Sequence, residues 1–580
     1  MANPIIRILG YLRPYWRIVA LSIVLLFASV GSDLVIPTLI QRIIDDGIVS
    51  KNITVIVTLT ALMIGVALLG AAATIGNTFL AIRAAQSFGA DVRSAAYHRI
   101  QKFSFGNLDR FQTGQIITRL TSDVNSVQMI VMMGLRMFIS APIMIVGSIA
   151  IMFIINAELA RIVLLLLPLT LLLAVVFVWK ALPMFLEVQK RLDRLNTVLQ
   201  ENLAGVRVVK AFVRQSHESM RFEEANTSLT DQTTKVLTIF SVLFPSMLVI
   251  INLSVLSVIW FGGLEAIGGR FSVGDILAFV NYLLIAIFPL IFLAIMSSQL
   301  SAAQASAQRI YEIIDSDPQV KEKPDAKQLT DVKGKVAFED VSFSYSGNLN
   351  EPVLQNVNLV AEPGQTIAIL GATGSGKSTL IDLIPRFYDV TKGRLTIDGV
   401  DVRDVTLESL RSNIGVALQE AILFSGTIRD NIRYGKPEAT EEEVISAAKA
   451  AQAHEFIIGM PKGYDADVGE RGAGLSGGQK QRVSIARALL VQPKILILDD
   501  STSSVDVETE ARIQEQLDSL MKGKTSFIIA QRISTVLKAD KIVVLDKGRV
   551  AAEGTHNELM ETSPIYREIY DSQLGGGIRL

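Results

Sequence analysis

Long apolar stretches alternate with polar segments over the first half of the chain. Six of these stretches are near or above the roughly 20 residues that a helix needs to cross a bilayer. They are Ile18–Ile40, Val55–Ile82, Met137–Ile155, Ile162–Leu182, Val236–Phe261 and Ile276–Met296. A buried helix of a soluble protein rarely runs this long without a charge. The pattern therefore predicts an all-α transmembrane domain with six helices.

The polar segments between the spans indicate how the chain is oriented. Those after the second and fourth spans are long and rich in arginine and lysine, whereas the others are short. Basic residues concentrate on the cytoplasmic side, and an even number of spans leaves both ends on one side. We therefore expect a multi-pass protein of the plasma (inner) membrane with cytoplasmic N- and C-termini. Ahead of the first span, Met1–Arg17 mixes apolar and basic positions, which favours a short amphipathic helix in the cytoplasmic interface.

The pattern changes after about residue 316, where a polar segment with prolines leads into short β-branched runs. These runs alternate with helical patterns and cover Val336–Tyr345, Gln365–Leu370, Ile414–Leu418, Ile495–Asp499, Thr525–Ala530 and Lys541–Asp546. Such alternation predicts an α/β domain with a largely parallel sheet. We expect a multidomain membrane protein with a transmembrane domain over 1–316, a linker over 317–334 and an α/β nucleotide-binding domain over 335–580.

Composition narrows the chemistry that the chain can perform. The 580 residues include four histidines and no cysteine, and the net charge is −1. Disulfides, thiolate zinc sites and cysteine nucleophiles are therefore excluded. The balanced charge gives no reason to expect nucleic-acid binding.

One glycine-rich segment carries a phosphate-binding pattern. Residues 371–378 read GATGSGKS, which fits the P-loop (Walker A) pattern G-x-x-x-x-G-K-[ST] between a predicted strand and a predicted helix. Backbone N–H groups of such a loop face the phosphates of ATP, Lys377 would reach the β- and γ-phosphates, and Ser378 would ligate Mg²⁺. The residues expected to hold ATP here are Gly371, Ala372, Thr373, Gly374, Ser375, Gly376, Lys377, Ser378 and Thr379.

Two further motifs complete the pattern. The apolar run Ile495–Asp499 ends in Asp499, the Walker B arrangement that holds the metal, expected here through water. Leu475, Ser476, Gly477, Gly478 and Gln479 form an LSGGQ sequence at the start of a helical segment. Its small residues can present N–H and hydroxyl groups to a γ-phosphate at a helix N-terminus.

These motifs, in this order, resemble the ATPase domain of ABC transporters. Six apolar spans fused ahead of one such domain are similar to an ABC exporter half-transporter (type IV transmembrane fold). The resemblance implies that LSGGQ and Asp506, in a D-loop, contact ATP bound by a partner subunit. It also implies that Tyr345 stacks on adenine and that Gln419 contacts Mg²⁺ and senses the γ-phosphate. Coupling helices are expected within Thr113–Asp123 and Gly205–Glu223, the second docking on the partner.

Two positions depart from the active pattern of this family. Asp500 stands where a glutamate normally polarises the attacking water, and Gln531 stands where a switch histidine normally follows the strand. One methylene fewer withdraws the carboxylate by about 1.5 Å, and a general base must lie within hydrogen-bond reach of its proton donor. Glutamine can bind a γ-phosphate but lacks the proton chemistry of imidazole. We infer a degenerate site that binds Mg-ATP and hydrolyses it slowly or not at all.

A degenerate site beside an intact LSGGQ motif resembles the pattern of bacterial heterodimeric multidrug exporters. It implies an ATP-driven exporter subunit with ATP and Mg²⁺ as cofactors, whose partner is a second half-transporter carrying the catalytic glutamate and histidine. Apolar or amphipathic drugs or lipids are the expected substrates. A peptide or lipid exporter, or a homodimer with slow hydrolysis, stays open. The intramembrane polar residues that could contact substrate are Asp33, Asn77, Arg136, Asn252 and Asn281.

Overall fold

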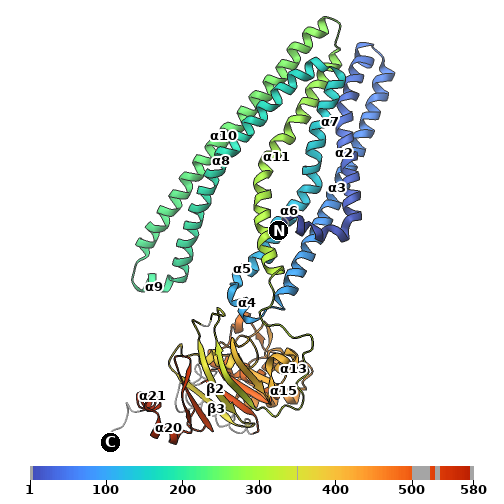
Figure 1. Ribbon diagram of the computed structural model, residues 1–580. Coiled ribbons are helices and arrows are strands. Elements are labelled where there is room, and N and C mark those ends of the chain that lie inside the picture. The colour runs from blue at the N-terminus through green and yellow to red at the C-terminus, as the bar shows by residue number, and fades with distance from the viewer. Residues whose placement is uncertain (1–3, 349, 500–522, 530–535, 575–580) are drawn as a thin grey trace. The chain divides into compact units, whose positions relative to one another are not determined.

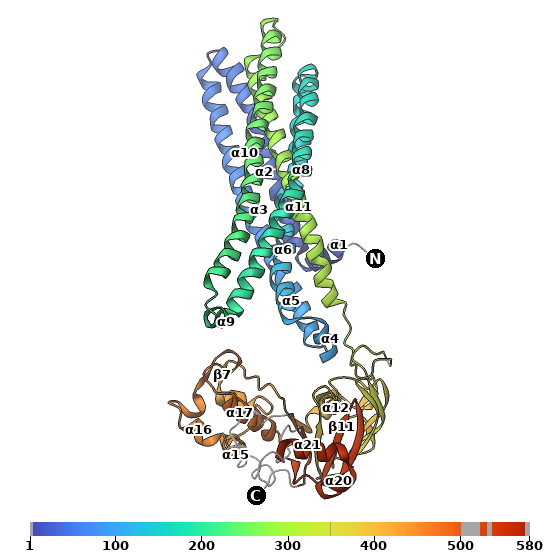
Figure 2. The same cartoon turned by 90° about the vertical axis from the view of Figure 1, so that its left-hand side faces the viewer.

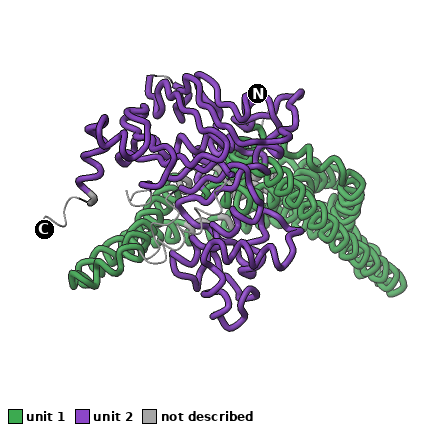
Figure 3. Tube along the Cα trace, turned by 90° about the horizontal axis from the view of Figure 1, so that it is seen from below, with its two compact units in different colours: residues 1–101, 113–316 green, residues 102–112, 317–580 purple. Residues whose placement is uncertain are grey.

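The chain folds into two compact units. The computed structural model describes residues 4–348, 350–499, 523–529 and 536–574, coloured along the chain in Figure 1. Unit 1 comprises Met1–Gln101 and Thr113–Ser316, and unit 2 comprises Lys102–Gln112 and Asp317–Leu580 (Figure 3). The short segment Lys102–Gln112 thus belongs with the second unit although it lies within the membrane half of the sequence.

Long helices make up most of the described part of unit 1. They are α2 (Trp16–Arg42), α3 (Ile53–Ile100), α7 (Ile139–Ile155), α8 (Ala157–Ala204), α10 (Gln215–Ile267) and α11 (Val273–Ile314). Each predicted span falls on one of them, the third beginning just ahead of α7. Among the described residues, the helical stretches long and apolar enough to cross a membrane are Pro4–Val49, Ile53–Ile100, Thr113–Ile155 and Leu248–Ile267. The predicted membrane-spanning helical domain is confirmed.

Shorter helical segments connect the long ones. They are α1 (Pro4–Ile8), η1 (Leu9–Tyr15), η2 (Ile43–Val49), α5 (Thr113–Thr118), η3 (Arg119–Asp123), α6 (Val124–Met133), η4 (Gly134–Phe138) and α9 (Val206–Ala211). The N-terminal segment is helical, as its pattern predicts. Its Ile8 is fully buried in a cluster with α3, α6 and α11, whereas Ile6 is 66% exposed. One face of this segment therefore packs on the helices of unit 1.

Close helix packing in unit 1 depends on small and polar residues. Gly70 of α3 lies against Ser32 of α2, where an added Cβ would come within 2.8 Å of the serine Cβ. Asn77 donates a 2.8 Å hydrogen bond to the backbone oxygen of Ser22 across the same helix pair. Such contacts are the usual means of helix association in lipid, because lipid tails are as apolar as the helix surfaces and the hydrophobic effect does not drive the helices together.

Helices α8 and α10 pack along each other and form a long arm. Their contact is among the most extensive of unit 1, and α9 joins their ends at the tip of the arm, away from α5 (Figures 1 and 2). The tip carries exposed apolar side chains, including Phe212 at 73% and Val213 at 77% exposure. Within unit 1 this tip buries little of its apolar surface.

Unit 2 contains a parallel sheet, as the sequence predicts. Its order is β12-β11-β3-β10-β9-β6, and only β12 runs antiparallel to its neighbour. The bounds are β3 (Thr366–Gly371), β6 (Ile414–Ala417), β9 (Ile495–Asp499), β10 (Thr525–Ile529), β11 (Lys541–Asp546) and β12 (Arg549–Gly554). Strands β9 and β10 are buried at every position, which is why they appear in the sequence as continuous apolar runs.

A second sheet in unit 2 is antiparallel and was not predicted. Its order is β2-β1-β4-β5, from β1 (Val336–Phe343), β2 (Leu354–Ala361), β4 (Lys392–Ile397) and β5 (Val400–Asp401). The short pair β7 (Gly426–Thr427) and β8 (Asp467–Val468) is separate. Alternate residues of β9 point to the two sides of the parallel sheet. Ile495 and Ile497 join a core with the antiparallel sheet, and Leu496 and Leu498 join a core with helices.

The helices of unit 2 surround these sheets. They are α4 (Phe105–Arg110), α12 (Lys377–Asp382), η5 (Val402–Asp404), α13 (Leu407–Arg411), α14 (Ile428–Arg433), α15 (Glu441–Ala450), α16 (His454–Ile458), η6 (Gly463–Asp465), η7 (Glu470–Gly472), α17 (Gly477–Leu490), α20 (His556–Thr562) and α21 (Pro564–Leu574). Residues of α14, α15 and α17 supply much of the helical core. The parallel sheet thus lies between a helical layer and the antiparallel sheet. Packing on both faces holds the strand ends that carry the predicted site.

Candidate nucleotide-binding site

The glycine-rich loop curls between the end of β3 and the start of α12. Gly371 has φ of +151° and Gly376 has φ of +99°, a conformation that L side chains rarely adopt. A Cβ on Gly371 would lie 2.3 Å from the backbone oxygen of Leu545 and 2.6 Å from Ser375 Oγ. Helix α12 begins at Lys377, so the loop ends on the first turn of a helix, as the sequence predicts.

A cavity of about 720 Å³ opens over this loop. The predicted residues that line it are Gly371, Ala372, Thr373, Gly374, Gly376, Lys377, Ser378, Thr379, Gln419 and Asp499. The structure therefore brings the predicted P-loop, Gln419 and Asp499 together, although they lie far apart in the sequence. Ser375 is an exception, since its Oγ is buried and has no hydrogen-bond partner.

Part of the cavity wall escaped prediction from the sequence. Ile565, Glu568, Ile569 and Ser572 of α21 border the same space. The amphipathic spacing of these positions indicates a helix, but nothing local shows that the helix lies beside a loop almost two hundred residues earlier.

The oxygen and cationic groups in this cavity fit Mg²⁺ and a polyphosphate. Ser378 Oγ lies 3.5 Å from Asp499 Oδ1, and Mg²⁺ prefers such oxygen ligands. Lys377 Nζ donates to the backbone oxygens of Gly371 and Ala372, each at 2.9 Å. Burial raises the pKa of the Asp499 carboxyl, while Ser378 and Lys377 oppose that effect. A bound cation would favour the charged form of this carboxyl.

Tyr345 lies beside the P-loop helix, where an aromatic ring for adenine is expected. Its Oη is 2.9 Å from Thr379 Oγ1, and half of the residue is exposed. The Tyr345 ring contacts Phe343 edge-on at 4.9 Å and Tyr388 edge-on at 5.2 Å between centroids. One face of a tyrosine held in this way can stack on a base.

Helix α4 packs on this aromatic group within unit 2. The ring of Phe105 stacks on Phe387 at 4.2 Å, and Tyr388 Oη donates a 2.7 Å hydrogen bond to Asp109 Oδ2. Burial and the neighbouring Asp109 raise the pKa of Tyr388, so its hydroxyl stays protonated and continues to donate. The first cytoplasmic segment thus reaches the ring that contacts Tyr345.

The position of α4 differs from the coupling segment that the sequence indicates. We expected the first coupling helix within Thr113–Asp123, which belongs to unit 1, whereas Phe105–Arg110 belongs to unit 2; the coupling role of Thr113–Asp123 stays a prediction. Helical periodicity runs through both stretches, so it does not distinguish them. The aromatic pair Phe387–Tyr388, five residues beyond α12, is the signal that could have identified the docking surface.

A partly buried carboxylate, that of Asp382, lies at the end of the P-loop helix. Burial, together with the charges of Asp499 and Asp109, raises the pKa of Asp382 to about 7. Asp382 therefore experiences the charges of both the expected metal ligand Asp499 and Asp109 of α4. No sequence motif pointed to this aspartate.

The LSGGQ residues form the first turn of α17. Ser476 is the N-cap, its Oγ accepts from Gln479 N at 3.3 Å, and Gln479 Oε1 accepts from Ser476 N at 2.9 Å. This capping box leaves the Gly477 and Gly478 N–H groups at the exposed helix N-terminus. None of the described residues that line the P-loop cavity belongs to Leu475–Gln479.

Three predicted residues, Asp500, Asp506 and Gln531, lie outside the described residues. Their roles stay predictions from the sequence. The described strands β9 and β10 end directly ahead of Asp500 and two residues ahead of Gln531, respectively.

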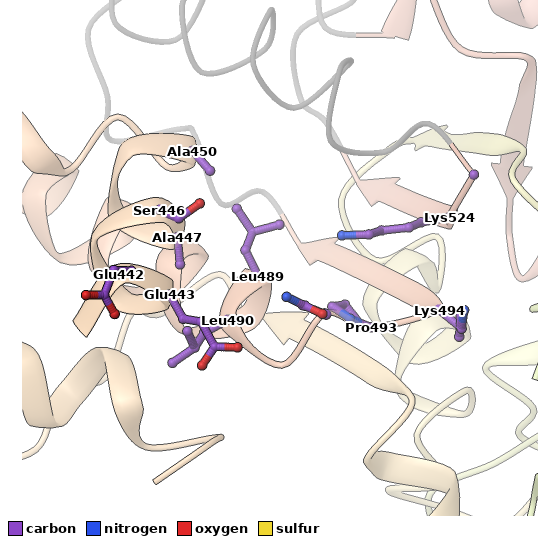
Figure 4. Close-up of a pocket in the computed structure, with 12 residues that line it drawn as sticks. Glu442, Glu443, Ser446, Ala447, Ala450, Leu489, Leu490, Pro493, Lys494 and Lys524 are labelled. Atoms are coloured by element: carbon purple, nitrogen blue, oxygen red, sulfur yellow. The ribbon is translucent and has the colours of Figure 1, made fainter. Parts of the chain in front are cut away.

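A further cavity, of about 630 Å³, lies at the other end of the parallel strands. Figure 4 shows Glu442 and Glu443 of α15 on one side and Lys494 and Lys524 on the other. The two lysines precede β9 and β10, whereas the P-loop follows β3. This cavity is therefore separate from the phosphate loop, and no sequence motif pointed to it.

The fold and the site define a class of protein. A helical membrane region is fused to an α/β unit in which a P-loop, a Walker B aspartate and a glutamine share one cavity and an LSGGQ motif caps a helix. Comparisons with known proteins agree. Residues 19–290 match the ABC transporter transmembrane region, and residues 354–503 match the ABC transporter ATPase family.

The chain belongs to the ABC transporter family. The uncharacterized ABC transporter ATP-binding protein YfiB of Bacillus subtilis is 40% identical over 98% of both chains. The ATP-dependent lipid A-core flippase of Syntrophus aciditrophicus is 36% identical over 98% of this chain and 94% of its own. YgaD of Bacillus subtilis, whose name refers to multidrug export, is 37% identical over 98% of this chain and 99% of its own.

A solved structure is similar over nearly the whole chain. The structure of a bacterial Atm1-family ABC exporter with ATP bound has a TM-score of 0.80 and 27% identity, covering 97% of this chain and 99% of that one. The chain is thus an ABC exporter half-transporter, in which the ATPase domain couples ATP hydrolysis to transport. It is a multi-pass inner-membrane protein with a cytoplasmic ATPase domain.

Proposed function

We propose that this chain is the degenerate-site subunit of a heterodimeric exporter for apolar or amphipathic compounds, either drugs or lipids. The observation that carries the proposal is the pair Asp500 and Gln531 at the positions of the catalytic glutamate and the switch histidine. The chain's own P-loop then holds Mg-ATP for long periods. Its LSGGQ motif and Asp506 serve a competent site built on the partner's P-loop.

The geometry of the LSGGQ motif supports a role toward a second chain. Its capped helix N-terminus is exposed at Ser476 and Gly477, and a helix N-terminus favours an anionic phosphate. The P-loop helix meanwhile lines a cavity to which this motif does not contribute among the described residues. In the proposed dimer, the phosphate at this motif belongs to ATP bound by the second nucleotide-binding domain.

The arm formed by α8, α9 and α10 also supports an obligate partner. Its tip exposes Val208, Phe212 and Val213, an apolar cluster that is costly to leave in water. In the proposed dimer this tip, within the second predicted coupling segment Gly205–Glu223, docks on the partner's ATPase domain. Substrates of apolar character agree with the names of relatives, a lipid A-core flippase and a protein named for multidrug export.

The test compares two variants of this chain in the transporter purified with its partner, in nanodiscs. Asp500→Asn should leave ATP turnover near the wild-type rate, because the competent site uses the partner's glutamate. Ser476→Arg should lower turnover about 100-fold or more, the loss that removal of one preorganised donor causes. A large loss with Asp500→Asn would refute the asymmetric model, since Asp500 would then act as the base of a homodimer.

A second measurement addresses the partner directly. The same chain is purified alone and with the half-transporter encoded beside it, and ATPase activity is compared. Turnover only in the mixed complex, lost when the partner's catalytic glutamate becomes glutamine, agrees with the proposal. Equal turnover by the chain alone contradicts it.

A further inference from the structure

Asp33 is an acidic residue within a predicted transmembrane helix, nearer to its Arg42 end than to its Arg17 end. It lies within α2, about 13 Å along the helix axis from Arg42 and about 24 Å from Arg17, at 1.5 Å per residue. Acidic residues at such depth are rare, because water does not solvate them there, and they usually mark substrate or ion pathways.

Asp33 faces the helix bundle rather than lipid. The buried residues of α2 include Ser22, Leu26, Val30 and Pro37, and Asp33 falls three residues after Val30 and four before Pro37. Positions at this spacing share one face of a helix. Asp33 itself is partly buried, so its carboxylate belongs to the inner stripe of α2.

Small residues of other helices lie beside this position. Gly70 of α3 lies against Ser32, and Gly147 of α7 lies against Leu34, where an added Cβ would meet the leucine Cδ1 at 2.6 Å. The two sequence neighbours of Asp33 thus face glycines on two different helices. Tyr282 of α11 donates a 2.6 Å hydrogen bond to the Leu34 backbone oxygen, which places a third helix next to the same turn.

Two nearby acidic residues, Asp45 of η2 and Asp275 of α11, differ from Asp33 because each accepts hydrogen bonds from other segments. Asp45 accepts from Ser272 Oγ at 2.5 Å and from Gly274 N at 3.0 Å, and Asp275 accepts from Gln41 Nε2 at 2.5 Å. Asp33 has no hydrogen bond or ion pair with any other residue that the structure describes. A carboxylate without a partner among the described residues can bind a charged group from outside the fold.

We propose that Asp33 is a specificity-determining residue that binds the positively charged group of an amphipathic substrate. The carboxylate attracts the cation, and the apolar body of the substrate stays in the apolar environment of the membrane region. This inference rests on the proposed export of apolar or amphipathic compounds and adds that these compounds carry a positive charge. A neutral compound of the same shape binds without using Asp33.

The experiment uses the assembled transporter in nanodiscs and two compounds of similar size. Tetraphenylphosphonium is a permanent cation, and triphenylphosphine oxide is neutral. For each compound, the concentration that gives half-maximal ATPase stimulation is measured with wild type, Asp33→Asn and Asp33→Glu. Basal ATPase activity and the thermal unfolding temperature report whether each variant is folded.

The expected result is selective. Asp33→Asn should raise the half-maximal concentration of tetraphenylphosphonium about tenfold or more, the loss expected when a hydrogen bond to a charged group disappears. The value for triphenylphosphine oxide should stay within about twofold, and Asp33→Glu should retain the response to the cation. Equal shifts for both compounds, or no shift for either, would overturn the role of Asp33. If neither compound nor any lipid stimulates the wild type, the proposed export function itself fails.

Discussion

Asp382 makes the stability of the ATPase unit depend on pH, and Asp382→Asn should remove that dependence. Burial together with the charges of Asp499 and Asp109 raises the pKa of this carboxyl to about 7, against about 3.9 in an unfolded chain. The folded state therefore binds this proton more tightly than the unfolded state. Since stability falls with pH wherever the folded state binds more protons, wild type should lose stability as pH rises from about 4 to about 7.

The size of the effect follows from the shift. A difference of about three pKa units at 1.36 kcal/mol each corresponds to about 4 kcal/mol once the pH exceeds about 7. For an ATPase unit of this size, 1 kcal/mol moves the unfolding temperature by about 2–4 °C. About 2.5 kcal/mol of this falls between pH 5 and pH 7.5, so Asp382→Asn, whose side chain carries no charge, should gain about 5–10 °C on wild type over that range.

The assay is thermal unfolding of the full transporter in nanodiscs, with EDTA and without nucleotide, from pH 5 to pH 8. Glu438→Gln, at an exposed position, is the control, because it removes the charge of one carboxylate that is not buried. Mg²⁺ with ATP should shrink the effect, since a bound cation favours charged carboxylates nearby. A gain from Asp382→Asn that is constant with pH, or that decreases as pH rises, would refute the reasoning.

Three other substitutions test separate parts of the structure. Gly371→Ala places a Cβ 2.3 Å from a backbone oxygen and should abolish binding of a fluorescent ATP analogue while costing about 1–3 kcal/mol of stability; wild-type affinity would contradict the loop geometry. Phe105→Ala removes the stack on Phe387 and should reduce the amount of substrate transported per ATP hydrolysed. Leu108→Ala, on the same helix, is the control. Unchanged coupling in both variants would argue against a role of α4 in transmitting ATP hydrolysis to transport. Asn77→Ala removes the hydrogen bonds of Asn77 to the neighbouring helices and should lower the free energy of unfolding in nanodiscs by about 0.6–2 kcal/mol. The measurement is the unfolding temperature. A shift below the measurement error would show that these hydrogen bonds are dispensable.

The sequence predicts the elements whose cause is local. A transmembrane helix follows from an uninterrupted apolar run, and the strand Ile495–Asp499 has the predicted bounds because all five of its residues are buried. The P-loop follows from glycines that the chain needs for its turns, as the positive φ of Gly376 shows. These signals lie within a few residues of one another, so one sequence suffices to read them.

Contacts between distant segments do not have such signals. Tyr388 and Asp109 lie 279 residues apart, and the local pattern around either residue does not indicate the other as its partner. The same holds for Asp382, whose raised pKa depends on burial by the tertiary fold. Helical periodicity identified the region of α4 but not the residues that dock, because an apolar stripe does not specify what it packs against.

The division of the chain places a limit on what can be cut from it. The path crosses between the units at Gln101–Lys102, at Gln112–Thr113 and at Ser316–Asp317, so the ATPase unit is assembled from two separate pieces of sequence. A fragment that starts at Asp317 lacks α4, and it leaves Phe387 and Tyr388 without Phe105 and Asp109. Such a fragment is a split protein, and a peptide of residues 102–112 is the missing piece that would complement it.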